Sequence, residues 1–162
     1  MVETIQYEPI RELGNVEIRK YPAIIVAKVV DPEADGFSLL YKFITGKNTQ
    51  KVKVQMTSPV LTETGSMAFV MPKELTFETT PQPLDERVKI ASIPSRTLAV
   101  LCFSGGWSEK HFEKETNELL NELAKAGIKT KGNVFTMLYN PPYIPGFLRR
   151  NEAAIEIEEA TK

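Results

Sequence analysis

A segment near the C-terminus combines apolar and cationic side chains in a pattern suited to binding a flat anionic molecule. Residues 139–151 read YNPPYIPGFLRRN, with aromatic and branched side chains, prolines and two arginines outside any helical period. Arginine binds carboxylates through paired N–H donors, and an exposed apolar patch of this kind usually has a partner. We expect the segment to be either a rigid loop that covers the open end of the core or a lid over a flat apolar ligand.

The single histidine and the single cysteine do not form a recognisable reactive pair. His111 is adjacent to Phe112 and about 100° off the apolar face of its predicted helix, so we expect it to be solvated; a metal ligand or general base is the alternative. Cys102 lies inside the apolar run at 98–103, which favours a buried, inert thiol over a thiolate ligand. One histidine and one cysteine cannot build a Cys/His zinc site.

Other catalytic patterns are weak. The run 104–108, SGGWS, fits an anion-binding nest, but a turn between a strand and a helix needs the same glycines. No Gly-x-Ser-x-Gly turn is present, and the acidic residues are too dispersed for a carboxylate pair to be chosen. We therefore predict that the protein is not an enzyme and has no metal site.

Composition indicates one ordinary soluble domain over residues 1–162. The chain has 20 Lys plus Arg against 21 Asp plus Glu, a net charge of −1, and 42% hydrophobic residues. Scattered basic residues argue against a nucleic-acid partner. The longest apolar stretch, 23–30, is too short to span a bilayer and no signal peptide is evident, so we expect no membrane partner. We expect a cytoplasmic monomer.

Periodicity predicts the elements that position these residues. Alternating or β-branched runs predict strands at 16–19 and 24–30 and, after a helix, at 52–59 and 67–71. Apolar residues at helical spacing predict the helix at 37–44, with Asp35 as N-cap and Gly46 as the stop. The proline-rich stretch 72–85 should be a surface connection.

The first strands recur 72 positions later, which indicates an internal repeat of about 16–71 and 88–158. A second helix at 108–126 follows, capped by Ser108, and the last strand places Ala153, Ile155 and Ile157 inward and three glutamates, among them Glu152, outward. The predicted fold is α+β: a distorted antiparallel β-barrel or curved sheet of two pseudo-symmetric strand-strand-helix-strand-strand halves with two helices.

Seven short motifs resemble one known family from about Tyr7 to Ile157. They are EIRKYP at 17–22, GKN at 46–48, MTSPV at 56–60, PLD at 83–85, FSG at 103–105, and NPP at 140–142 with RRNE at 149–152. In this order they resemble the SOUL haem-binding protein family. The resemblance implies the barrel described above, shared with the effector-binding domains of gyrase-inhibitor-like proteins.

The resemblance also implies a ligand site. Family members bind haem and other tetrapyrroles in an apolar groove beside the first helix; here the matching residues are Phe37, Leu40, Tyr41, Ile44, Met56 and Val60, with Tyr143, Phe147 and Arg149 closing the groove. The histidine that some members place near this helix has no counterpart, so the axial ligand is unassigned. We predict non-enzymatic binding as carrier, buffer or sensor. The alternatives are another flat apolar ligand, or a protein-interaction module using residues 81–83 or the C-terminal loop.

Overall fold

A computed structural model describes residues 3–106, 108–140 and 144–158. The chain divides into unit 1, residues Met1–Ile5 and Ala23–Pro94, and unit 2, residues Gln6–Pro22 and Ser95–Lys162. Each unit has its own apolar core. No helix in the described part of the chain has the length and apolarity needed to cross a bilayer. Tyr143, one of the predicted site residues, lies outside the described residues.

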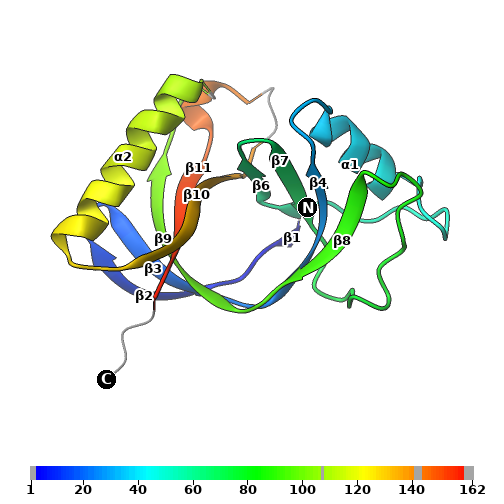
Figure 1. Cartoon of the computed structure of the whole chain (residues 1–162), viewed down its shortest axis with the longest axis horizontal. Coiled ribbons are helices and arrows are strands. Elements are labelled where there is room, and N and C mark those ends of the chain that lie inside the picture. The colour runs from blue at the N-terminus through cyan, green and yellow to red at the C-terminus, as the bar shows by residue number, and fades with distance from the viewer. Residues whose placement is uncertain (1–2, 107, 141–143, 159–162) are drawn as a thin grey trace. The chain divides into compact units, whose positions relative to one another are not determined.

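Unit 1 is an antiparallel sheet with one helix packed on it. Its strands β4 (Ile24–Val30), β6 (Val60–Glu63), β7 (Ser66–Val70) and β8 (Val88–Ile93) have the order β6-β7-β4-β8. Helix α1 (Gly36–Ile44) packs against β4, β7 and β8, as Figure 1 shows. Two short strands, β1 (Glu3–Thr4) and β5 (Thr57–Ser58), form a separate parallel pair.

Helix α1 begins and ends where the sequence predicts. The Asp35 carboxylate accepts a hydrogen bond from the backbone N–H of Ser38 at 3.1 Å, which satisfies one of the free N–H groups of the first turn. The helix ends at Ile44 with Thr45 as its C-cap, and the next residue, Gly46, has a φ of +132°, a conformation that glycine adopts without strain. One side of this short helix is buried in the core.

Unit 2 repeats this plan with a longer helix. Its strands have the order β2-β3-β9-β11-β10, all antiparallel: β2 (Glu8–Leu13), β3 (Val16–Tyr21), β9 (Arg96–Phe103), β10 (Thr130–Leu138) and β11 (Asn151–Ile157). Helix α2 (Glu109–Lys125) packs on β9 and β11 (Figure 1). The predicted N-cap Ser108 accepts a hydrogen bond from the N–H of His111 at 3.1 Å.

The internal repeat is visible in the strand pairing. Strand β8 lies 72 positions after β3, yet β3 pairs with β9 in unit 2 whereas β8 pairs with β4 in unit 1. Val16 is paired with Leu101 in unit 2. Val88, 72 positions after Val16, is paired with Val29, 72 positions before Leu101, in unit 1. Each repeat therefore contributes its first strand to the unit that contains the other repeat's helix. The predicted α+β class, with two helices and curved antiparallel sheet, is confirmed.

Two sequence predictions about strands are wrong. Of the predicted strand at 52–59, only Thr57–Ser58 is a strand (β5). Residues 52–56 are not, because the Asn48 side chain takes the backbone hydrogen bonds of Val52: its amide donates to the Val52 carbonyl and its oxygen accepts from the Val52 N–H. Strand β11 is not covered on one face only, since Asn151 through Ile155 are all buried. Alternation of apolar and polar residues assigned Glu152 to solvent, but that residue has 0% exposure.

Candidate ligand-binding surface and a buried charged cluster

Helix α1 exposes two aromatic rings on the side that faces away from its core. Phe37 is 45% and Tyr41 51% exposed, and they lie one helical turn apart. Their ring centroids are 6.1 Å apart and their planes differ by only 11°. Phe37 also contacts the buried Phe69 edge-on at 5.5 Å, which fixes its orientation. The helix thus presents a pre-oriented aromatic surface to solvent.

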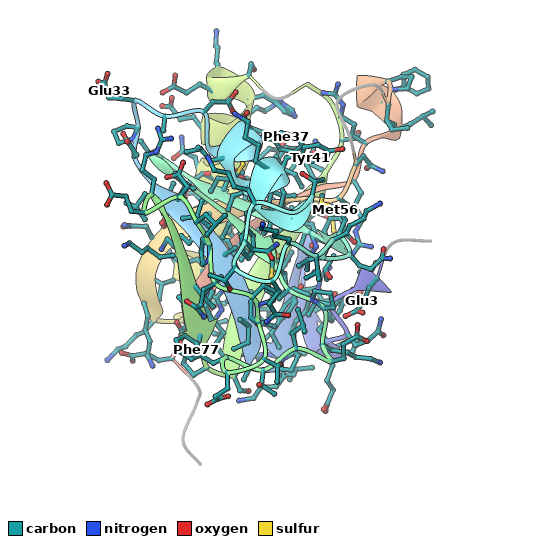
Figure 2. The ribbon with its side chains drawn as sticks, turned by 90° about the vertical axis from the view of Figure 1, so that its right-hand side faces the viewer. Glu3, Glu33, Phe37, Tyr41, Met56 and Phe77 are labelled. Carbon is teal, nitrogen blue, oxygen red and sulfur yellow. The ribbon has the colours of Figure 1, made fainter. Side chains whose placement is uncertain are left out.

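The other predicted residues of unit 1 lie beneath or beside this aromatic pair. Leu40 and Ile44 are core residues, 0% and 3% exposed, so they hold the helix on the sheet. Met56 and Val60 are half-buried and pack against the same core. Figure 2 labels Phe37 and Tyr41 on α1 with Met56 below them in the view. Phe147 and Arg149 belong to unit 2, so their part in closing a site stays a prediction.

Two lysines lie on or just beyond α1, near the aromatic pair in the sequence. Lys42 is exposed on α1 next to Tyr41, and Lys47, just beyond the helix, is 48% exposed while lying 3.8 Å from Asp85. Residues 1–94 contain neither histidine nor cysteine. Unit 1 can therefore offer a ligand ring faces and positive charge, but no imidazole or thiolate for a metal.

A buried ion pair lies in unit 2, between strands β3 and β11. The Arg19 guanidinium donates to both oxygens of Glu152, at 2.9 Å each, and the two side chains are 3% and 0% exposed. Burial would raise the pKa of Glu152, but hydrogen bonds from Arg19 and Cys102 outweigh it and hold the pKa below its usual value. Burial would lower the pKa of Arg19, and the Glu152 contact raises it instead. Both groups are charged.

Aromatic rings and a second arginine enclose this ion pair. Arg19 lies 4.1 Å from the ring centre of Tyr7 and donates to the Tyr21 hydroxyl at 2.9 Å. Arg150 donates to Glu152 at 3.1 Å and lies 4.0 Å above the Tyr139 ring. Burial raises the pKa of Tyr21 to about 12, so its phenol is protonated at neutral pH.

Cys102 borders the same cluster, and the prediction that it is buried is wrong. It is exposed rather than buried, because its side chain lies on the sheet face opposite the α2 core and donates from Sγ to Glu152 Oε2 at 3.0 Å. Partial burial of the thiol and this hydrogen bond raise its pKa to about 11. The group is a thiol at neutral pH, and thiols are far poorer nucleophiles and metal ligands than thiolates.

His111 is not solvated as predicted but makes packing and hydrogen-bond contacts within unit 2. It is half-buried, its Nε2 lies 3.0 Å from the carbonyl oxygen of Ser104, and its ring meets Phe103 edge-on. The contact ties the start of α2 to the turn after β9, where Gly105 has a φ of +117°. No group of three or more potential metal ligands occurs among the residues that the structure places.

A polar cavity of about 520 Å³ lies at one end of the unit 2 sheet. It contains none of the predicted site residues; its lining residues are Lys20, Ser95, Arg96, Thr97, Lys131, Glu156, Ile157 and Glu158. Charges of both signs line it, whereas sites for apolar small molecules are lined mainly by apolar side chains. This cavity does not match the apolar groove that the sequence predicts.

The profile described as SOUL heme-binding protein matches residues 2–156, and the chain belongs to this family. It is 31% identical to Heme-binding protein 2 of Homo sapiens, over 92% of this chain and 82% of that protein.

Solved structures share the fold at low sequence identity. The C-terminal domain of EcmrR matches with a TM-score of 0.66 at 10% identity, over 96% of this chain and 100% of that one. A hydrolase from Listeria innocua matches with a TM-score of 0.59 at 11% identity, over 89% and 92% of the two chains. These likenesses concern the fold alone.

Sequence reasoning missed the Arg19–Glu152 pair, although both residues lie inside motifs used to assign the family. Arg19 was assigned to the polar face of its strand and Glu152 to solvent. The available signal is charge within the two strands, and nothing in the sequence sets Arg19 apart from Glu17 and Lys20 in β3, or Glu152 apart from Glu156 in β11. Pairing across strands 133 positions apart could not be deduced from that signal.

Proposed function

We propose that the exposed aromatic side of α1 binds haem or a related tetrapyrrole, without catalysis, so that the protein acts as a carrier, buffer or sensor. The observation that carries the proposal is the parallel, half-exposed pair Phe37 and Tyr41. Water contact with two aromatic rings is unfavourable, and a flat apolar macrocycle would cover both at once. The family match and the human relative's name support this ligand class.

The residues present fit a macrocycle held by its faces and carboxylates. The aromatic pair and the half-buried Met56 offer apolar contact, and the exposed Lys42 offers a positive charge to a carboxylate. Because residues 1–94 lack histidine and cysteine, unit 1 has no strong iron ligand of either kind. We therefore expect iron-free protoporphyrin to bind about as tightly as haemin.

Titrations of variants with haemin and with iron-free protoporphyrin, followed in the Soret band, test the proposal. Phe37→Ala removes about 80 Å² of exposed aromatic surface, worth about 2 kcal/mol, or roughly thirtyfold in affinity. Tyr41→Ala should have a similar effect. Leu40 is unsuited to this test because its replacement would disrupt the core. Phe77→Ala is the matched control, since Phe77 is 46% exposed in unit 1 but lies far from α1 in Figure 2.

Three outcomes distinguish the proposal from its rivals. Weaker binding of both porphyrins by the two α1 variants, with Phe77→Ala unchanged, supports it. Equal affinity in all variants would refute the assignment to α1. Preferential saturable binding of flat aromatic cations would assign the same fold to a different ligand. The cytoplasmic location, the monomeric state and the single domain stay predictions.

A further inference from the structure

The turn before β11 displays two large apolar side chains to solvent. The 3₁₀ helix η1 (Gly146–Leu148) carries Phe147 at 77% and Leu148 at 62% exposure. Phe147 is the most exposed large apolar residue in the part of the chain that the structure describes. We propose that this turn inserts into the surface of an anionic lipid bilayer and docks unit 2 there.

The turn is held rigidly, so the exposure of its apolar side chains is built into the fold. Its backbone is fixed by Leu148 N–H donating to the Pro145 carbonyl at 2.9 Å and Gly105 N–H donating to the Gly146 carbonyl at 2.8 Å. A Cβ on Gly146 would lie 3.3 Å from the backbone of Gly105, so the two glycine segments are in close contact. Little ordering is left to occur on binding, which favours association.

The size of the apolar tip suits a bilayer better than a protein. Phe147 and Leu148 together expose roughly 250 Å² of side chain, whereas a stable protein interface buries about 800 Å² on each partner. Insertion into the headgroup region requires no complementary surface and relies on a few apolar side chains together with attraction between basic residues and anionic lipids.

Charge at the base of the turn agrees with an anionic partner. Residues 144–151 contain Arg149 and Arg150 and no acidic residue. Arg150 is 45% exposed and shares the Glu152 carboxylate, 3.1 Å away, with the buried Arg19, so this one negative charge does not offset both arginines. The expectation of no membrane partner rests on the lack of a segment long enough to span a bilayer, which does not concern binding at the bilayer surface.

Vesicle co-sedimentation of the full chain tests the proposal. Wild type should bind vesicles of 70% phosphatidylcholine and 30% phosphatidylserine, and bind phosphatidylcholine alone more weakly. The double variant Phe147→Ser/Leu148→Ser should bind the mixed vesicles at least tenfold more weakly, whereas Phe77→Ser, another exposed phenylalanine, should bind like wild type. Circular dichroism verifies that both variants are folded.

Several results would overturn the proposal. The first is that wild type does not bind the mixed vesicles, and the second is that the double variant binds them as well as wild type. The third is that both side chains are needed for a lipid-free protein complex while the protein does not bind vesicles. Haemin titration of the double variant provides an independent readout. If the variant loses haemin affinity but keeps vesicle binding, the turn closes a ligand site, as the sequence predicts, and does not dock to lipid. Loss of vesicle binding by the folded double variant supports the inference whether or not its haemin affinity changes.

Discussion

Replacing Glu152 by glutamine should destabilise the protein strongly, because it leaves the buried Arg19 guanidinium with only the partly exposed Glu17 as a counter-ion. The Glu152 and Arg19 side chains are 0% and 3% exposed and share two hydrogen bonds of 2.9 Å. Each charge-assisted hydrogen bond is worth roughly 1.5–3 kcal/mol, and breaking a buried pair costs about 3–5 kcal/mol. The total stability of a domain is about 5–15 kcal/mol, so this variant should lose a large share.

Urea unfolding of three variants measures this effect. Glu152→Gln and Arg19→Met should each lower the free energy of unfolding by about 3–5 kcal/mol. The double variant Arg19→Met/Glu152→Leu should regain most of that loss, since apolar residues of similar volume replace a buried ion pair at little cost. Lys125→Met is the control, because the Lys125–Glu122 pair is exposed, at 76% and 31%, and exposed pairs contribute little. Losses in the double variant equal to the sum of the single losses would refute the reasoning.

Three further perturbations have defined outcomes. The pKa of Glu152 is depressed in the fold, so its stabilising effect is complete above the ordinary value of 4.5 and is lost as pH falls below it. The free energy of unfolding should therefore fall less steeply with decreasing pH for Glu152→Gln than for wild type, and identical slopes would contradict this. The Cys102 thiol, with a pKa of about 11, should react slowly with iodoacetamide at pH 8. Glu152→Gln should speed the reaction about tenfold by removing a negative neighbour, and an unchanged rate would exclude Glu152 as the cause of the raised pKa. Asp35→Ala should cost about 1 kcal/mol by removing the N-cap of α1, and an unaltered urea midpoint would show that the cap is dispensable.

Local features of the fold could be predicted from the sequence. Asp35 and Ser108 are helix caps because a short polar side chain before an apolar helical period satisfies free N–H groups. The repeat predicted the strands at 16–21 and 88–93, because a buried strand needs the same alternation wherever it occurs.

Features that depend on distant contacts could not be predicted. Alternation in β11 distinguishes two faces, but it does not reveal whether both are buried, and Glu152 is buried by side chains from β3 and β9. Val52 alternates like a strand residue, yet one buried asparagine, Asn48, takes its hydrogen bonds. The family resemblance implies Phe37, Leu40, Tyr41 and Ile44 as ligand-binding residues. Their exposure in the structure distinguishes Phe37 and Tyr41 from the core residues Leu40 and Ile44, whereas their spacing in the sequence does not.

The proposed binding surface is tested most directly by mapping where the ligand lies. In a ¹H–¹⁵N correlation spectrum of the labelled protein, saturating iron-free protoporphyrin avoids broadening by paramagnetic iron. If the ligand binds at α1, the largest shift changes should occur in the α1 amides, residues 36–44, and in residues near Met56. Phe37→Ala should reduce these changes. Shift changes confined to unit 2, with the α1 amides unmoved, would contradict the account.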